Sequence, residues 1–430
     1  MWVLFETVYS PLNGLWRIYL YGGLLLLSWF SYLHSKPFGD SPLQAPEVLR
    51  ASSQLFFDPP GLMKWLPRGM LQLRWVFIVR NVVLIAWIAC ILGLGGQWSA
   101  WIVGVGVLFL HGVLSGVLGT NHRWMLPVYV LLAASLVNLN SSYSLDAWIA
   151  ERYAGYWFAP DTDGIASTGM LRFLTLLLVV FTLFSGGVSK LRYAGLRWMD
   201  GESLRFFISR PDAGACSWLK NRLKNSPRSC RWLSIATIVL ELGSPLALLY
   251  DQALIPLIVG ALLFHLGIWL TMNPNYLPQS WCYLLCLNGM GDLSVSSASA
   301  SAFQCPSNTA LLLLVILVVI LVIVALRGIE WWPLTCIPMY GFYRGPYQQW
   351  SFEHVLDLPQ MHQLGLEYRK SRLPYPISWS EKWVAVQVKS KEGKTRELRP
   401  HNVRKKHWFR TLHRVAAMDF ALKANDPYHD

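Results

Sequence analysis

The chain has 430 residues, of which 54% are hydrophobic and only 14% are charged. Soluble globular proteins carry about 25% charged residues, so this composition argues against a soluble domain and indicates a protein that lies in lipid. The formal net charge of +13 is not accompanied by any recognised nucleic-acid-binding module. Because basic loops are typical of membrane proteins, we expect a lipid bilayer as partner and no nucleic acid.

Long apolar runs follow one another along most of the chain. They cover residues 15–33, 75–96, 98–119, 124–139, 170–188, 232–250, 254–272 and 308–327. Most approach the roughly 20 residues that a helix needs to cross the hydrocarbon core. A shorter run at 281–291 is a ninth candidate, as a short or re-entrant helix. The sequence therefore predicts an all-α polytopic membrane protein with about eight or nine transmembrane helices, of which the first is retained and not cleaved as a signal.

Two consecutive loops carry opposite charge. The segment 189–231 holds ten basic and three acidic residues, whereas the segment 140–169 holds four acidic residues and one arginine. These loops are predicted to face opposite sides of the membrane, with the basic loop in the cytoplasm. The expected location is an integral, multi-pass position in the endoplasmic reticulum or in a bacterial inner membrane.

The sequence pattern changes after about residue 330. Val384, Val386 and Val388 alternate with other residues ahead of a turn at 391–394, which predicts a β-hairpin. Residues 404–424 have apolar side chains near helical spacing, which predicts an amphipathic helix. We therefore divide the chain into a membrane domain, residues 1–330, and a small C-terminal α+β extramembrane region, residues 331–430.

The seven cysteines are too scattered for a disulfide framework. Cys282 and Cys286 are four residues apart, but no CxxC pair or histidine partner accompanies them, so we expect no metal site. One disulfide that involves Cys305 or Cys336 is left open.

Ionisable residues in or beside the apolar runs are the candidates for chemistry. Lys190 follows the run 170–188, where a long side chain can either reach the headgroups or remain buried. Glu241 lies one or two turns inside an apolar run and needs a partner or a proton. His265 lies within a run and His122 lies between two runs, and either can form an ordinary hydrogen bond. Because burial disfavours the charged form of a lysine, a buried lysine can act as a general base on a lipid-soluble quinol.

Several segments carry a resemblance to a known family. The stretch "FSGGVSKL", followed by "RWMDGESL", resembles the segment of the vitamin K-dependent gamma-glutamyl carboxylases that holds their catalytic lysine. The stretch "TNHRWMLPVYVLL" resembles the family's Asn-His segment at the start of a helix. "LELGSPLALL", "FHLGIWLTMN" and "WWPLTCIPMYGFY" are similar to later parts of the same HTTM-type membrane domain. The likeness covers most of the chain in order.

This resemblance implies an enzyme that couples two reactions. Oxygen would oxidise vitamin K hydroquinone to its epoxide, and carbon dioxide would carboxylate the gamma carbon of a glutamate in a peptide or protein substrate. On the matching positions, Lys190 would deprotonate the hydroquinone, and His122, positioned by Asn121, would handle protons beside it. The cofactor-binding site would include Glu241, His265 and Trp198.

The chain also departs from the family. It is shorter than the animal carboxylases, lacks most of their large C-terminal region, and has Asn140 where they have a histidine-containing segment. Three alternatives therefore stay open. The chain can be a quinone-dependent membrane oxidoreductase with another acceptor, which keeps Lys190 and His122. It can also be a non-catalytic membrane maturation factor or, more weakly, a transporter, although no inverted repeat is evident.

Overall fold

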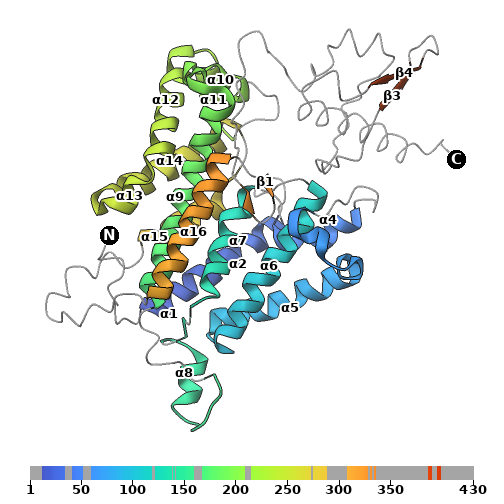
Figure 1. Cartoon of the computed structure of the whole chain (residues 1–430), viewed down its shortest axis with the longest axis vertical. Helices are drawn as coiled ribbons and strands as arrows, with labels where there is room; N and C mark the ends of the chain where they lie inside the picture. Colours follow the sequence, from blue (N-terminus) through green and yellow to red (C-terminus); the bar gives the residue numbers. More distant parts are fainter. Residues whose placement is uncertain are drawn as a thin grey trace.

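The computed structural model describes residues 12–33, 41–51, 60–118, 122–137, 139–140, 142–158, 167–208, 215–272, 275–287, 308–327, 330–331, 334–335, 386–389 and 395–398. Figure 1 shows that most of these residues form α-helices, which pack along one another. The predicted helical class is thus confirmed for this part of the chain.

Within the described residues, five helical stretches are long and apolar enough to cross a membrane. They are Leu73–Leu92, Gly96–Gly116, Leu171–Asp200, Pro227–Leu249 and Asp251–Met272. They correspond to helices α5 (Leu73–Leu92), α6 (Gly96–Leu118), α9 (Ser167–Ala194), α12 (Pro227–Gly243) and α14 (Leu254–Met272). A total of eight or nine spans stays a prediction.

Other helices correspond to the remaining apolar runs. The first run forms one continuous helix of α1 (Leu12–Arg17), a π-helical turn η2 (Ile18–Gly22) and α2 (Gly23–Leu33). Helix α7 (His122–Ala134) has 13 residues, a length of about 20 Å, which is shorter than the hydrocarbon core. Helices α15 (Leu277–Leu287) and α16 (Asn308–Arg327) correspond to the last two runs.

Small helices and turns connect the long ones. The 3₁₀ turns η3 (Pro42–Gln44), η5 (Gly61–Trp65) and η6 (Arg68–Leu71) and helix α4 (Ala45–Ala51) precede α5, and α8 (Leu145–Ala150) lies between α7 and α9. The turn η8 (Gly195–Asp200) and helices α10 (Glu202–Ile208) and α11 (Ser217–Lys224) follow α9, and α13 (Leu246–Leu249) and η9 (Asp251–Ala253) join α12 to α14.

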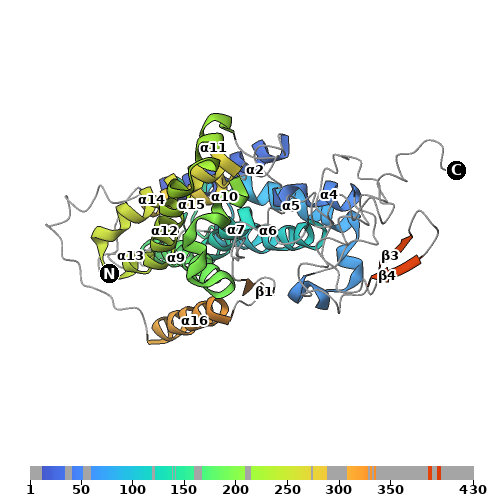
Figure 2. The ribbon, with the colours of Figure 1, turned by 90° about the horizontal axis from the view of Figure 1, so that it is seen from above.

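Helix α9 is the central element of the bundle. It packs against α7, α12, α15 and α16. Its apolar stretch is 83% buried, whereas only 28% of the stretch in α5 and 33% of that in α12 and α14 are buried. Figure 1 shows α16 and α12 beside α9, and Figure 2 shows α16 at the outer edge of the helices when seen from above.

The outer helices expose large apolar side chains. Ile85 on α5 is 72% exposed, and Val239 on α12 and Leu263 on α14 are also exposed. A soluble monomer rarely exposes contiguous apolar surface on this scale. The distribution suits helices whose outer faces contact hydrocarbon chains.

A tight turn sets the path from α5 to α6. Gly93 ends α5 in the left-handed conformation, with φ 68°, which glycine adopts without a steric cost. A Cβ at this position would lie 2.4 Å from Ser144 Cβ and 2.6 Å from Arg17 Nη1. Gly93 therefore also provides the space into which Arg17 fits.

The described strands are short. β1 (Glu330–Trp331) pairs antiparallel with β2 (Leu334–Thr335), and β3 (Val386–Lys389) pairs antiparallel with β4 (Thr395–Leu398). In the second pair, Val386 lies opposite Leu398 and Lys389 opposite Thr395, on either side of the turn that the sequence predicts. The amphipathic helix at 404–424, Cys305 and Cys336 lie outside the described residues, so the extramembrane α+β region stays a prediction.

Candidate functional site

Lys190 lies inside the helix bundle and does not reach toward the surface. Its side chain is on α9, one turn before the end of this helix, and the residue is 1% exposed. Lysines are almost never fully buried unless they are paired with another group. The structure therefore requires a partner for this amine.

The partner of Lys190 is Glu241, which lies on α12 and is 3% exposed. The Lys190 Nζ atom donates hydrogen bonds to both carboxylate oxygens of Glu241, at 2.6 and 2.8 Å. The two residues are 51 positions apart in the sequence, so only the packing of α9 against α12 brings them together. The pair carries no net charge, whichever of the two groups holds the shared proton.

The glycine pair that precedes Lys190 explains this close packing. Gly186 lies one helical turn before Lys190, and a Cβ there would lie 3.2 Å from Glu241 Oε1. A Cβ on Gly187 would lie 2.9 Å from Leu242 Cδ2 and 3.0 Å from Glu241 Cβ. Small residues let helices approach one another closely in membrane proteins. The "GG" of "FSGGVSK" thus makes room for the carboxylate that pairs with the lysine.

Trp198 also lies against the Lys190 amine. It lies on the 3₁₀ turn η8, is buried, and places its ring centroid 5.2 Å from Lys190 Nζ. Such a distance allows a cation–π interaction. The turn is fixed against α12 at Gly201, which has φ 90° and where a Cβ would lie 2.5 Å from the Arg231 backbone nitrogen.

His265 on α14 belongs to an aromatic stack. Its ring lies 4.9 Å from the ring of Tyr276 and 5.4 Å from that of Tyr283, with an interplanar angle of 11° to the second. His265 and Tyr283 are both buried, and His265 lies near Lys190. His265 Nδ1 and Tyr283 Oη have no hydrogen-bond partner among the described residues. Buried polar atoms without a partner are uncommon in folded proteins.

The Asn-His segment contacts helix α15. His122 is the first residue of α7 and is partly buried, and its backbone oxygen accepts a hydrogen bond of 2.6 Å from Gln279 Nε2. Gln279 lies on α15, the helix that also carries Tyr283. Asn121 lies outside the described residues. The structure thus places Glu241 and Trp198 around Lys190, and it places His122 against α15 through its backbone oxygen.

Sequence reasoning missed the contribution of α15. Tyr276, Gln279 and Tyr283 follow one another at spacings of three and four residues, which places them on one side of the helix. This periodicity was a usable signal, because polar groups recur on one face of a largely apolar segment. The run 281–291 predicts a short helix, and α15 spans Leu277–Leu287.

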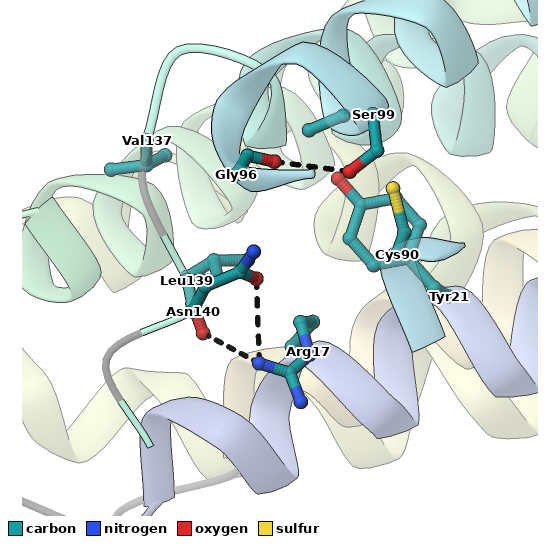
Figure 3. A pocket seen from close by; sticks show the side chains of 9 residues that line it. Arg17, Tyr21, Cys90, Gly96, Ser99, Val137, Leu139 and Asn140 are labelled. Atoms are coloured by element: carbon teal, nitrogen blue, oxygen red, sulfur yellow. Dashed lines mark hydrogen bonds between the residues drawn. The ribbon is translucent and has the colours of Figure 1, made fainter. Parts of the chain in front are cut away.

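A second polar cluster surrounds Arg17, and we call it the Arg17–Asp146 cluster. The Arg17 guanidinium donates to the backbone oxygens of Leu139 (3.1 Å) and Tyr143 (2.6 Å) and to Asn140 Oδ1 (3.4 Å). Figure 3 shows Arg17 directed toward Leu139 and Asn140. The cavity beside it measures about 10 Å³, which is room for one water molecule at most.

Asp146 completes this cluster. Its carboxylate accepts hydrogen bonds from the backbone nitrogens of Gly95 (3.1 Å) and Gly96 (2.7 Å), from Asn140 Nδ2 (2.8 Å) and from Tyr156 Oη (2.7 Å). Burial, together with the neighbouring Asp146 carboxylate, raises the pKa of Tyr156 to about 12, so this hydroxyl remains a donor at neutral pH. Asn140 is therefore part of a structural cluster that ties α8 to the α5–α6 turn.

The Lys190–Glu241 pair is the better candidate for chemistry. It places an amine and a carboxylate in a buried, apolar surrounding, where a ligand in contact with them can exchange a proton away from water. His265 and Tyr283 add polar atoms that have no hydrogen-bond partner among the described residues. Comparisons of the chain with protein families, with curated proteins and with solved structures found no match.

Proposed function

We propose that the chain is an integral membrane enzyme that uses vitamin K hydroquinone to carboxylate the gamma carbon of a peptide glutamate. The observation that carries this proposal is the buried Lys190–Glu241 pair within helices that are apolar enough to lie in a bilayer. A proton acceptor in such a place serves a substrate that arrives from the lipid. The membrane is that of the endoplasmic reticulum or of a bacterial cell.

Three groups near the pair would suit a reduced naphthoquinone. This substrate is flat and apolar and carries two oxygens that need hydrogen-bond partners. His265 Nδ1 and Tyr283 Oη lack partners among the described residues and can meet such an oxygen, while the Trp198 ring offers a flat apolar surface. The hydroquinone supplies the reducing equivalents that oxygen consumes. The chain's own residues supply binding, proton transfer and exclusion of water.

The Lys190–Glu241 pair acts as one proton-accepting unit. When Lys190 holds the shared proton, Glu241 accepts the next one, and when Glu241 holds it, Lys190 accepts. In either case the uncharged pair becomes a cation. A buried cation attracts the anion that the proton has left, because charges interact strongly where water is excluded. His122, positioned by Asn121, serves a second proton transfer in this proposal.

A quinone-dependent oxidoreductase with another acceptor is the second candidate. The buried pair favours it equally, because both candidates begin with deprotonation of a quinol. We propose glutamate and carbon dioxide as substrates because "FSGGVSKL" and "TNHRWMLPVYVLL" resemble segments of the carboxylases.

The deciding experiment is an assay of the purified chain with reduced vitamin K, a glutamate-containing pentapeptide and labelled bicarbonate. We expect the unchanged protein to incorporate label, and we expect Lys190→Ala and Glu241→Gln to reduce incorporation by about 10²–10⁴-fold, the usual contribution of general acid–base catalysis. His122→Ala is expected to reduce it as well. Arg228→Gln, an exposed position outside the site, is the control and should retain activity.

Oxidation of the quinol without incorporation of label would replace the first candidate with the second. Absence of turnover with several quinols, in protein that is shown to be folded, would reject both.

A further inference from the structure

Residues 215–232, which include α11 and the first turn of α12, form a surface segment that we call the basic segment. It contains no aspartate or glutamate, and its five basic residues are Lys220, Arg222, Lys224, Arg228 and Arg231. Arg222, Lys224, Arg228 and Arg231 are exposed. The segment therefore presents concentrated positive charge on the surface.

Backbone hydrogen bonds fix the basic segment at the ends of two long apolar helices. The Ala215 nitrogen donates to the Trp269 oxygen at 3.3 Å, and the Cys216 nitrogen donates to the Leu270 oxygen at 2.9 Å. Both acceptors lie in the last turn of α14, and α12 begins three residues after α11 ends. Figure 1 shows α10 and α11 together at one end of α12. Since α12 and α14 have the length and hydropathy of membrane spans, the segment lies where the headgroups of a bilayer begin.

Two tryptophans accompany the charges. Trp218 is 65% exposed and Trp232 is 72% exposed. The guanidinium carbon of Arg222 lies 5.6 Å from the centroid of the Trp218 ring. Exposed tryptophans next to lysine and arginine are typical of the interface between hydrocarbon and headgroups, where the ring contacts apolar chains and the cation contacts phosphate.

We propose that the basic segment binds the phosphate headgroups of anionic phospholipids. An acidic peptide would satisfy the charges, but it would leave unexplained why the exposed tryptophans lie at the ends of apolar helices. This inference does not depend on the proposed reaction: the basic segment approaches the site where the Arg231 backbone lies beside Gly201, and the variants tested below leave Arg231 unchanged.

The test is lipid binding by the full chain, purified in detergent and depleted of lipid. Bound phosphatidylglycerol is counted by native mass spectrometry during a titration, and parallel titrations use phosphatidylcholine, inorganic phosphate and a glutamate-rich peptide. We expect phosphatidylglycerol to bind in preference to phosphatidylcholine. The triple variant Arg222→Gln, Lys224→Gln, Arg228→Gln should weaken its binding at least about tenfold, because each basic residue near an anionic surface contributes to the attraction.

A matched variant keeps the positive charge at the same three positions. Arg222→Lys, Lys224→Arg, Arg228→Lys should retain most of the phosphatidylglycerol binding, because the charge of the basic segment is unchanged. The thermal unfolding midpoint of each variant without lipid shows that it is folded. Equal loss of binding in the two variants, displacement of the lipid by equal concentrations of inorganic phosphate, or a preference for the acidic peptide would each overturn the proposal.

Discussion

The Arg17–Asp146 cluster and the Lys190–Glu241 pair are both buried and polar, but they are built differently. Arg17 and Asp146 bond largely to the protein backbone, at the oxygens of residues 139, 142 and 143 and at the nitrogens of Gly95 and Gly96. Lys190 and Glu241 bond to each other. Buried polar atoms without a partner in the described part of the chain occur beside both, at Arg17 Nε and Tyr21 Oη in the first and at His265 Nδ1 and Tyr283 Oη near the second.

This difference predicts different consequences of substitution at the two places. A charged side chain that satisfies several backbone groups cannot be replaced without leaving those groups unpaired, and each such loss costs about 1–3 kcal/mol. A charged pair that satisfies only itself adds little to the fold, and an apolar pair of similar volume can replace it at no cost or with a gain of about 1–4 kcal/mol. Such a pair is compatible with the proton transfer that we propose for it.

The largest expected effect comes from two double variants. One replaces Arg17 and Asp146 by apolar residues, and the other replaces Lys190 and Glu241. Arg17→Met with Asp146→Leu should lower the free energy of unfolding by several kcal/mol, because backbone groups lose their partners. Lys190→Met with Glu241→Leu should leave it unchanged or raise it, while quinol-dependent activity is lost. Thermal unfolding in detergent and the label-incorporation assay measure the two quantities.

The single variant Glu241→Leu is the control for this comparison. It leaves Lys190 as an unpaired buried charge and should lower stability by about 3–5 kcal/mol, more than the double variant does. If the two double variants lose stability equally, the distinction between the two regions is wrong.

An intermediate effect is expected at the glycine that lets α12 approach α9. Gly187→Ala places a methyl group against Leu242 and Glu241, which should cost about 1–3 kcal/mol through overpacking. Because Glu241 is displaced from Lys190, activity should fall more than the loss of stability alone explains. Activity is measured at a temperature where the variant remains folded.

Gly267 on α14 is the matched position, because nothing lies within 4 Å of a Cβ built there. Gly267→Ala should retain both stability and activity. Full activity of Gly187→Ala would show that the close approach at this glycine does not position the carboxylate.

The smallest effect is expected from removal of one hydroxyl. Tyr283→Phe should leave stability unchanged or raise it slightly, since a buried hydroxyl without a partner is costly to maintain. It should raise the Michaelis constant for the quinol, because one hydrogen bond to the ligand is lost. Steady-state kinetics with varied quinol concentration measure this change.

Tyr21→Phe changes a buried tyrosine beside Arg17 and should leave the Michaelis constant unaltered. An equal change in both variants would indicate a general effect on the fold, and no change in Tyr283→Phe would remove Tyr283 from the binding site.

Much of the helical structure could be predicted because it depends on local pattern. The runs at 75–96, 98–119, 170–188, 232–250 and 254–272 all correspond to long apolar helices, since a helix satisfies its own backbone in lipid. The length of α7 was less predictable, because the apolar run continues to residue 139 whereas the helix ends at Ala134. The functional contribution of α15 depends on which face of that helix turns toward α14.

The sequence by itself determined that Lys190 and Glu241 lie in or beside apolar helices, because residue type and position along the chain suffice for that. It also showed that Glu241 needed a partner or a proton. Only the tertiary structure decided that this partner is Lys190, because the contact joins residues 51 positions apart and depends on how closely α9 and α12 pack. That closeness results from the absence of side chains at Gly186 and Gly187, whose effect becomes visible only when the opposing helix is in place.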